Sequence, residues 1–554
     1  MKTPALRLLA CAALVAAAAA HAATPDTRLV WRRDGQLHAA QRDAASPVDA
    51  TTASSTWHTP LGSSWKFFMH AYLHANGVQE PAYRCQVGQR LPDEEYCCEP
   101  GESIGRDEAL ARSCGPYFDA KRLGVSADDW SRYWKAQEAP AWLLQLSQLQ
   151  PATELRVDDL LQAVARIPGA EKTAARQALM PVALRDPSVA AAIGSGPRYK
   201  TWSWRIAGER AGGATGWLLD GSPFWFGAPG TSKTALQANA RWIGEQLPAT
   251  APDAAAVAAQ DCVEVGFFQR YPIRSVTRGE GGDSPDGPMS GRHRIAFENG
   301  SQMVIDAVPA LVLRRDVDGP RISARLPLED YVARVVDREG NARETQAARA
   351  LAVAARSYVL QNGAPGEGCR TIADDSRQQR VSPNSASAAA RAAAAFTHGM
   401  VLAGASVRYH GDKASDGVMS WQEAVAQGRA GLRFDDILRK AYPAATLAGT
   451  QAVGDCDELP QAAQWLAQRQ RRWRDALRSQ PGFEPVGEAL RVCRLDSGTP
   501  HSDQRRLVIR VREWTSREGR VTLIHEYLHL AFRHHPVGRD EAAIERLAQR
   551  LADS

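Results

Sequence analysis

The stretch "LGSSWKFF" at residues 61–68 decides which fold is expected for the first part of this chain. Ser63 and Lys66 stand three residues apart, so on a helix their side chains share one face. A lysine shielded from water loses proton affinity and can act as a base toward such a serine. Alternatively, Ser63 is a helix N-cap that follows Gly62, and Lys66 is solvated. A bare SxxK pattern is common, so this stretch alone favours the second interpretation.

The length and composition indicate a globular protein of several domains. The chain has 554 residues, which is too many for one hydrophobic core, so we expect about three or four domains. Hydrophobic residues make up 44% and charged residues 23% of the chain, and the net charge is +5. Positive and negative residues are interspersed, so the charge pattern does not indicate a nucleic-acid-binding protein.

The N-terminus has the three parts of a secretory signal peptide. Lys2 and Arg7 precede a short apolar run, and Ala20-His21-Ala22 has the small-x-small pattern of a cleavage site. Cys11 follows Leu9-Ala10 and is an alternative lipidation site, although the apolar run continues past it. We expect a cleaved signal peptide over residues 1–22, a periplasmic protein and no membrane span in the mature chain.

The cysteines beyond the signal peptide are even in number, which in an exported chain indicates disulfides. We predict the pairs Cys262–Cys369 and Cys456–Cys493. The remaining four allow three connectivities, in which adjacent cysteines bond elsewhere more readily than to each other. These four are Cys85, Cys97, Cys98 and Cys114. No CxxC pair occurs, so a cysteine-based zinc cluster is not expected.

Two further stretches change the interpretation of Ser63. The first is "ALARSCGPYF" (109–118), in which Gly115 follows two residues after a serine. The second is "RYKTWSWR" (198–205), just before a strand-like run that begins "GGATGWLLDG". Together with SxxK, their order resembles the SxxK, SxN and KTG motifs of the penicillin-recognising serine enzymes. Over about residues 61–230 the chain is similar to penicillin-binding-protein transpeptidases.

This resemblance implies a role for each polar residue of the three motifs. Ser63 would be the acyl-forming nucleophile, and Lys66 would be its base. Ser113 would relay protons, while Lys200 and Thr201 would hold the substrate carboxylate.

Two residues depart from the pattern of these enzymes. Gly115 replaces the asparagine of SxN and removes a side chain that would contact the substrate amide. Trp202 replaces the glycine of KTG and places a ring beside the edge strand, where a bound peptide needs an open edge. We therefore expect a transpeptidase-like fold, with Trp202 as a residue that could cover this edge.

The middle of the chain has a second motif, "LPLEDYVARVVDREGNARETQAARALAVAARSYVL" at residues 326–360. This stretch, with a closing segment at 417–443, resembles the SpoIID/LytB family, which acts on peptidoglycan glycan strands or stimulates amidases that do. The resemblance covers about residues 262–445 and assigns Glu339 as the catalytic acid, which could protonate a glycosidic oxygen. The alternative is a solvated Glu339.

The middle region also departs from its family. It has Leu351 where glutamine is usual, and Ser415-Asp416-Gly417 where a histidine-containing GHG is usual. This domain could therefore bind glycan without cutting it.

A third motif, "LIHEYLHLAFRHH" (523–535), contains HExxH. His525 and His529 are four residues apart on a predicted helix and can bind one zinc, with Glu526 as the base for a zinc-activated water. A catalytic zinc needs a third protein ligand. We predict Glu541, with Glu545 second, because a reversal at 536–538 lays the next helix against the first. The alternative is a solvated helix with two histidines.

Together these motifs predict an α+β multidomain protein that works at the cell wall. The expected parts are a signal peptide (1–22), an N-terminal extension (23–60), a serine transpeptidase/β-lactamase-like domain (61–246), a linker (247–261), a SpoIID/LytB-like domain (262–445) and an HExxH zinc-peptidase-like domain (446–554). The whole chain resembles the YfaQ-type envelope proteins. Its expected partner is peptidoglycan. The alternative function is a catalytically degenerate wall-binding scaffold for another envelope protein.

Overall fold

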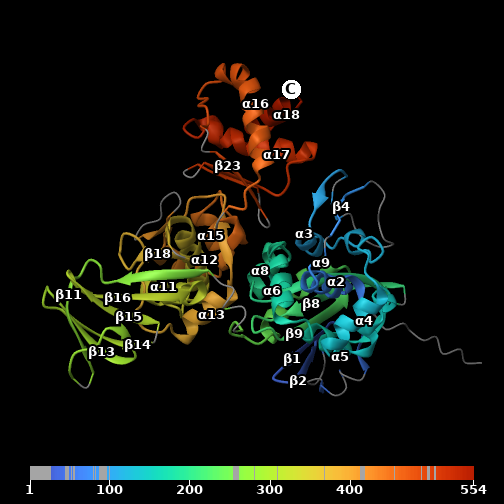
Figure 1. The fold of residues 1–554 in the computed structure, drawn as a ribbon, viewed down its shortest axis with the longest axis horizontal. Helices are drawn as coiled ribbons and strands as arrows, with labels where there is room; N and C mark the ends of the chain where they lie inside the picture. Colours follow the sequence, from blue (N-terminus) through green and yellow to red (C-terminus); the bar gives the residue numbers. More distant parts are fainter. Residues whose placement is uncertain are drawn as a thin grey trace, which may run out of the picture.

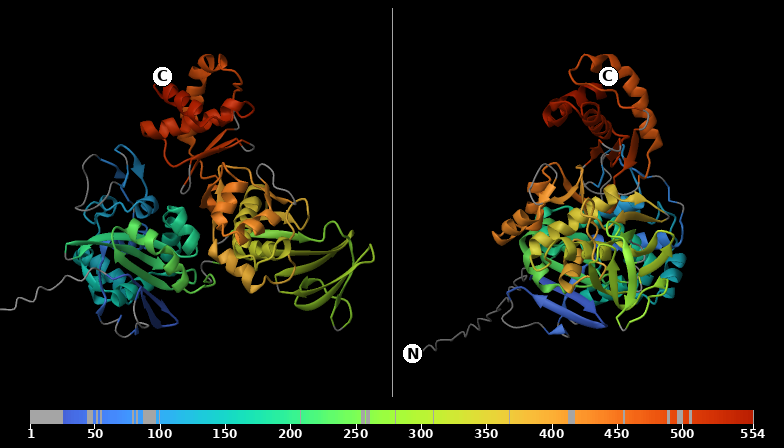
Figure 2. Two further views of the ribbon diagram at one scale, coloured as in Figure 1. Left: turned by 180° about the vertical axis from the view of Figure 1, so that it is seen from behind. Right: turned by 90° about the vertical axis from the view of Figure 1, so that its left-hand side faces the viewer.

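The computed structural model describes residues 26–553, with gaps at 44–48, 51–52, 54–55, 79, 82, 87–96, 99, 207, 254–256, 258–260, 280, 309, 367, 412–417, 454–455, 488–489, 496–499 and 505–506. The described residues form three units, each around its own hydrophobic core (Figure 1). The third unit lies over the junction between the first two (Figure 2). None of the described helices is both long enough and apolar enough to cross a bilayer. The predicted signal peptide and Cys11 lie outside the described residues.

The first unit is built on a five-stranded antiparallel sheet in the order β2-β1-β9-β8-β7. Its strands are β1 (Arg28–Arg33), β2 (Gln36–Gln41), β7 (Arg198–Ile206), β8 (Glu209–Trp217) and β9 (Pro223–Pro229). Two short pairs lie beside it: β3 (His58–Pro60) with β6 (Glu154–Arg156), and β4 (Tyr83–Arg84) with β5 (Ser103–Ile104). The hairpin β1–β2 turns at Asp34 and Gly35, whose φ angles of 51° and 76° suit a two-residue turn.

Helices complete the first unit. They are η1 (Gly62–Ser64), α2 (Trp65–Ala75), α3 (Arg106–Ala111), η2 (Pro116–Phe118), α4 (Ala127–Ala136), η3 (Ala141–Leu144), η4 (Leu146–Gln148), α5 (Val157–Ala165), α6 (Gly169–Ala178), α7 (Met180–Leu184), α8 (Pro187–Ile193) and α9 (Ser232–Gln246). The α2 helix is buried on nearly all sides because aromatic rings surround it; Phe68, for example, meets Trp134 and Trp142 edge to face.

The second unit combines two sheets with a helical layer. Its six-stranded sheet has the order β12-β15-β16-β10-β18-β17, and its three-stranded sheet has the order β11-β13-β14. The strands are β10 (Cys262–Phe267), β11 (Ile273–Arg278), β12 (Gly287–Pro288), β13 (Gly291–Phe297), β14 (Gln302–Ala307), β15 (Leu311–Asp316), β16 (Gly319–Pro327), β17 (Ala364–Pro365) and β18 (Cys369–Ala373). The helices are α11 (Leu328–Glu339), α12 (Thr345–Asn362), α13 (Ala388–Phe396), α14 (Trp421–Arg429) and α15 (Phe434–Ala441).

Small strands close the second unit. They are β19 (Met400–Ala403), β20 (Arg408–Gly411), β21 (Val418–Ser420) and β22 (Thr446–Gly449), followed by η5 (Thr450–Ala452). The α12 helix is rich in alanine, which lets α11, α13, α14 and α15 approach it closely. A second Ala-rich stretch of the sequence forms α13.

The third unit is a small helix–sheet–helix arrangement. It contains α16 (Pro460–Arg478), β23 (Arg491–Arg494), β24 (His501–Asp503), β25 (Val508–Val511), α17 (Arg517–Ala531), η6 (Pro536–Arg539) and α18 (Glu541–Ala552). The sheet order is β23-β25-β24, and α17 packs on β24 and β25. His535 accepts a hydrogen bond from the Val537 N–H where the chain reverses, and α18 then lies against α17.

Two predicted boundaries are corrected by the strand pairing. The hairpin β1–β2 belongs to the sheet of the first unit, so residues 28–41 are part of that unit and not a separate extension. Strand β22 pairs with β19, so residues 446–449 belong to the second unit. In both cases a strand finds its partner far along the chain, which local composition does not reveal.

Four disulfides are present among the described residues. Cys262 and Cys369 face each other directly on neighbouring strands β10 and β18, and Cys456 bonds to Cys493. These two predicted pairs are confirmed. The first four cysteines pair as Cys85–Cys98 and Cys97–Cys114, so the adjacent Cys97 and Cys98 bond elsewhere, as expected.

Candidate functional site

The Ser63 site combines a helix start with a loop far along the chain. Ser63 lies in η1 and Lys66 in the first turn of α2, where the Lys66 side chain is fully buried. Lys66 Nζ donates a hydrogen bond to Ser63 Oγ at 3.2 Å, and Ser113 Oγ donates to the same oxygen at 2.9 Å. The structure therefore brings Ser63, Lys66 and Ser113 together. A solvated Lys66, the alternative interpretation, does not agree with this burial.

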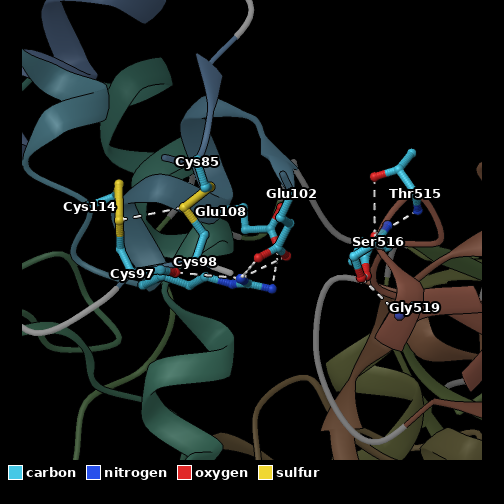
Figure 3. A network of polar contacts seen from close by, with 11 residues as sticks. Cys85, Cys97, Cys98, Glu102, Glu108, Cys114, Thr515, Ser516 and Gly519 are labelled. Atoms are coloured by element: carbon cyan, nitrogen blue, oxygen red, sulfur yellow. Dashed lines mark hydrogen bonds and ion pairs between the residues drawn. A yellow bond between two sulfur atoms is a disulfide. The ribbon is translucent and has the colours of Figure 1, made fainter. Parts of the chain in front are cut away.

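Ser113 has a backbone conformation that non-glycine residues rarely adopt. Its φ is 65°, in the left-handed region, which costs about 1–3 kcal/mol unless the surroundings enforce it. The disulfide between Cys97 and the next residue, Cys114, holds this loop. Figure 3 shows that bond beside the Cys85–Cys98 disulfide, next to Glu102 and Glu108. The strain is consistent with a residue whose position matters for function.

Strand β7 carries the KTG-like motif along the edge of the sheet and lies against η1. Lys200 is fully buried, and its Nζ donates to the Thr201 carbonyl at 3.1 Å. Lys200 and Trp202 are two residues apart on a strand, so their side chains point to the same face of the sheet, the face on which η1 lies.

Trp202 does not cover the outer edge of β7. Its ring is 2% exposed and stacks on Trp225 of β9, with ring centroids 5.9 Å apart. Gly62 and Gly227 make room for it, because a Cβ on either would lie 3.0 or 3.3 Å from a Trp202 side-chain atom. The possibility that Trp202 covers the edge is thus corrected: the ring lies across the sheet face, where glycines leave space.

Glu339 lies at the end of α11, shortly before α12 begins. Its side chain is half-buried, and Oε1 accepts a hydrogen bond from the Arg380 backbone N–H at 2.7 Å. Leu351 is buried in the α12 core. Ser415, Asp416 and Gly417 lie outside the described residues.

Sequence reasoning missed a buried ion pair in the second unit. Arg356 of α12 donates two hydrogen bonds to Glu329 of α11, at 2.9 and 2.5 Å. Burial alone would raise the Glu329 pKa, but Arg356 and the Gly399 N–H outweigh it, so the pKa lies below its usual value. Both residues lie within the motif at 326–360. An acid and an arginine at positions that face the core of two neighbouring helices could have predicted this ion pair.

The HExxH residues converge with the following helix. His525 and His529 lie one turn apart on α17, with their Nε2 atoms 3.0 Å apart. Glu541, the first residue of α18, places Oε2 3.1 Å from His525 Nε2 and 3.6 Å from His529 Nε2. These two imidazoles and one carboxylate form a donor set that suits a metal ion.

The outer nitrogens of both histidines also have partners. His525 Nδ1 lies 2.9 Å from Glu545 Oε2, and His529 Nδ1 lies 2.8 Å from the Gly538 carbonyl oxygen. A carboxylate or carbonyl in this place fixes the orientation of a metal-binding imidazole. The reversal at 536–538 thus serves twice: it brings Glu541 to the histidines and it supplies the Gly538 carbonyl.

Glu526 points from α17 toward the sheet and is 7% exposed. Its burial raises its pKa to about 7, against the opposing effects of His525 and of a hydrogen bond with Ser502 on β24. A buried carboxyl with such a pKa can exchange a proton near neutral pH.

Known proteins match this chain over most of its length and over shorter parts of it. It is 39% identical over 524 residues to the uncharacterized protein YfaQ of Escherichia coli (strain K12), which covers 93% of this chain and 93% of that protein. The chain belongs to the YfaQ family. Within this YfaQ-family chain, a predicted secreted protein family (DUF2300) matches residues 89–211 and 417–537, and stage II sporulation protein (SpoIID) matches 318–403.

Solved β-lactamases resemble one part of this YfaQ-family chain. A class D β-lactamase from Bacillus subtilis is 12% identical and covers 41% of this chain and 94% of its own, with a TM-score of 0.29. A β-lactamase from Francisella tularensis is 11% identical and covers 40% and 93%, with a TM-score of 0.27.

The family descriptions bear on location and on the middle unit. The predicted secreted family confirms the expected export, and four disulfides agree with an oxidising compartment outside the cytoplasm. The SpoIID match confirms the predicted resemblance over residues 318–403, within the second unit.

Proposed function

We propose that this YfaQ-family protein works at peptidoglycan and has a zinc-dependent, peptidase-like hydrolase site in its third unit. The SpoIID match supports the wall location. The observation that carries the hydrolase proposal is the convergence of His525, His529 and Glu541, whose ligating atoms lie within 4.8 Å of one another.

The distances support zinc as the metal. Zinc binds imidazole nitrogen and carboxylate oxygen at about 2.0–2.2 Å, so two ligand atoms of a tetrahedral site lie roughly 3.3–3.6 Å apart. The three separations here are 3.0, 3.1 and 3.6 Å, close to that range. Three protein ligands leave one position for water or substrate, as in catalytic rather than structural zinc sites.

Each residue of the cluster has a distinct role in this proposal. A bound zinc would supply Lewis-acid chemistry and lower the pKa of water. Glu526 would accept the proton from the attacking water. Glu545 and Gly538 orient the histidines. The histidine side chains are 17% and 15% exposed, so a substrate can reach them.

The first two units would recognise the wall. In the first unit, Ser63, Lys66 and Ser113 form the arrangement expected of a serine acyl-transfer site, with Lys200 and Thr201 on the adjacent strand. In the second, we assign Glu339 as the acid of a glycan-binding site.

A second candidate is a catalytically degenerate scaffold that binds peptidoglycan for another envelope protein. The departures at Gly115 and Trp202 favour the scaffold. Gly115 stands where the related enzymes have asparagine. Trp202 stands where they have glycine, and its side chain fills the space beside Gly62. The two candidates differ most clearly at the third unit, where only the hydrolase requires a metal.

Metal analysis of the purified mature chain tests the proposal. We expect about one zinc per chain after zinc-replete growth and dialysis, and sedimentation of the chain with isolated sacculi. Well-folded protein without zinc that still binds sacculi would support the scaffold. Failure to bind either intact or peptide-stripped sacculi would contradict both candidates.

A further inference from the structure

The second half of helix α16 in the third unit is strongly cationic. Its charged residues are five arginines and one aspartate, which leave a net charge of +4: Arg469, Arg471, Arg472, Arg474, Asp475 and Arg478. Trp473 and Leu477 are buried in the core of the third unit, whereas all of the arginines except Arg469 are exposed. We call Arg471, Arg474 and Arg478 the arginine face, because helical spacing places them on one side of α16, away from the buried side chains.

The arginine face lacks the acidic partners that an exposed arginine has elsewhere in this chain. On α9, for example, Arg241 pairs with Glu245 four residues later, at 2.9 Å. On α16, Asp475 stands four residues after Arg471, yet among the described residues neither Asp475 nor any α16 arginine forms an ion pair. The charge of the arginine face is therefore available to an outside partner.

The spacing of the arginine face makes its members repel one another. Arg471 and Arg474 are three residues apart, and Arg474 and Arg478 are four apart, so their guanidinium groups are neighbours. Like charges at these spacings destabilise a helix. Arg478 lies in the last turn, where the helix dipole favours a positive charge, but Arg471 and Arg474 come before that turn. An anionic partner would relieve this repulsion.

Acidic side chains near α16 do not neutralise its charge. Those next to its two ends in sequence already have basic partners: Asp457 with Arg494, Glu458 with Arg491, and Glu484 with Arg533. At the start of α17, the exposed Glu518 is balanced by Arg520, whose guanidinium lies over the Trp465 ring of α16. The surroundings of α16 therefore leave its positive charge in place.

The position of α16 indicates what kind of partner the arginine face can meet. Figures 1 and 2 show that α16 extends from the side of the second unit to the far end of the third unit. The arginine face lies in the half of the helix that is farther from the second unit. The structure describes all of α16, and none of its large apolar side chains is exposed. This surface therefore suits contact with charged groups and not insertion into the apolar interior of a bilayer.

We propose that the arginine face of α16 binds the phosphate headgroups of an anionic phospholipid surface. A guanidinium group matches phosphate oxygens with paired hydrogen bonds, and a cluster of four to eight basic residues on a helix is typical of proteins that bind anionic lipid. A bilayer is favoured over the carboxylates of the wall because the arginine face points away from the two units assigned to the wall. The proposal requires neither zinc nor wall binding, only the export that brings the protein to a membrane surface.

Flotation of the full mature chain with lipid vesicles tests this proposal. We expect the chain to bind vesicles of phosphatidylglycerol and phosphatidylcholine in equal parts at low salt, and not to bind pure phosphatidylcholine. Binding should fall as salt is added, because salt screens exposed charges. Each arginine near an anionic surface strengthens binding about fivefold, so the combined variant Arg471→Gln, Arg474→Gln and Arg478→Gln should bind about a hundredfold more weakly.

A matched variant separates the arginine face from net charge. The combined variant Arg205→Gln, Arg210→Gln and Arg241→Gln removes the same charge from exposed positions of the first unit and should bind the vesicles like the unmodified chain. If circular dichroism shows that the α16 variant misfolds, Arg471→Gln alone, with an expected loss of about fivefold, carries the test.

Two results would overturn the proposal on the vesicles alone: no binding of the unmodified chain to the anionic vesicles, or equal losses in the two combined variants. Sedimentation with isolated sacculi gives the third result. We expect it to be the same in both combined variants and in the unmodified chain. If the α16 variant lost sedimentation with sacculi but kept its binding to vesicles, the arginine face would serve the wall, and the lipid proposal would be wrong.

Discussion

The Ser63 site and the His525 cluster differ in how far apart in sequence their residues lie. Ser113 reaches Ser63 from 50 residues away, and β7 comes from still farther. The histidine cluster is complete within α17, η6 and α18, and Glu541 lies only 16 residues from His525. The first site therefore depends on the packing of a whole unit, whereas the second depends on one helix reversal.

The serine site also depends on the neighbouring unit. At the start of β7, Arg198 Nη2 donates to the His398 carbonyl oxygen at 3.1 Å, and Ser195 Oγ donates to the same oxygen at 2.8 Å. His398 belongs to the second unit, just before β19. The histidine cluster has its supporting contacts, Glu545 and Gly538, within its own unit. A change in how the units pack should thus affect the serine site and spare the cluster.

The largest expected effect is the loss of metal from the self-contained site. His525→Ala removes one of three ligands and should reduce bound zinc from about one per chain to none after dialysis. His534→Ala is the matched control, because His534 is exposed and lies near Glu484 rather than in the cluster. Zinc retained in His525→Ala would show that the metal binds elsewhere, and the comparison would fail.

The second effect separates metal binding from catalysis. Glu526→Gln keeps the size of the side chain but cannot accept a proton, so it should retain zinc and lower peptide hydrolysis by about 10²–10⁴-fold. Release of new amino groups from peptide-containing sacculi measures the rate. Equal rates in Glu526→Gln and the unmodified chain would remove Glu526 from the reaction.

Low pH should destabilise the region around His398, which supports the serine site. Burial, offset in part by Glu329, lowers the His398 pKa from 6.5 to about 4. The folded state therefore binds this proton less readily than the unfolded state. The resulting contribution of His398 to the free energy of unfolding is complete above pH 6.5 and is lost as the pH falls toward 4. The loss between pH 7.5 and 4.5 should be about 2–3 kcal/mol in the free energy of unfolding.

The measurement for His398 is a pair of denaturant titrations at the two pH values. His398→Gln cannot titrate, so its stability should fall less than that of the unmodified chain over the same interval. An equal fall in both proteins would show that other groups determine the acid sensitivity.

A smaller effect is expected at the residue that orients His525. Glu545→Gln weakens the contact to His525 Nδ1 without touching the ligating atoms, and should lower zinc affinity about 10–100-fold. Competition with a chromophoric chelator measures the affinity. Glu518→Gln, exposed in the first turn of α17 and about two turns before His525, controls for the change in charge. If Glu545→Gln bound zinc as tightly as the control, Glu545 would have no orienting role.

The sequence predicted what helix spacing determines. Ser63 with Lys66, and His525 with His529, stand three and four residues apart, so their contacts follow from the helix alone. The predicted placement of Glu541 and Glu545 required one further inference, the chain reversal at 536–538, which a proline and a glycine indicate. These predictions needed no knowledge of distant contacts.

Contacts between distant parts of the chain were not predictable in the same way. The hairpin β1–β2 has an evident turn, but nothing local shows that β1 pairs with β9. The direction of the Trp202 ring depends on Gly62 and Gly227, which lie on other elements. Asp435 and Arg512 are ordinary charged residues in sequence, and only the packing of three units places them around one cavity.

The last prediction concerns the reactivity of Ser63 and its dependence on the second unit. Because Ser63 Oγ accepts hydrogen bonds from Lys66 and Ser113, and Trp202 leaves the outer edge of β7 uncovered, we expect a fluorescent penicillin to acylate Ser63. Gel fluorescence should disappear in Ser63→Ala. Arg198→Gln removes the link to the His398 carbonyl and should slow labelling by about threefold to tenfold. Arg205→Gln, at the other, exposed end of β7, should not. An unlabelled intact chain would support a binding role for the first unit, and equal rates in both arginine variants would show that the serine site is as self-contained as the histidine cluster.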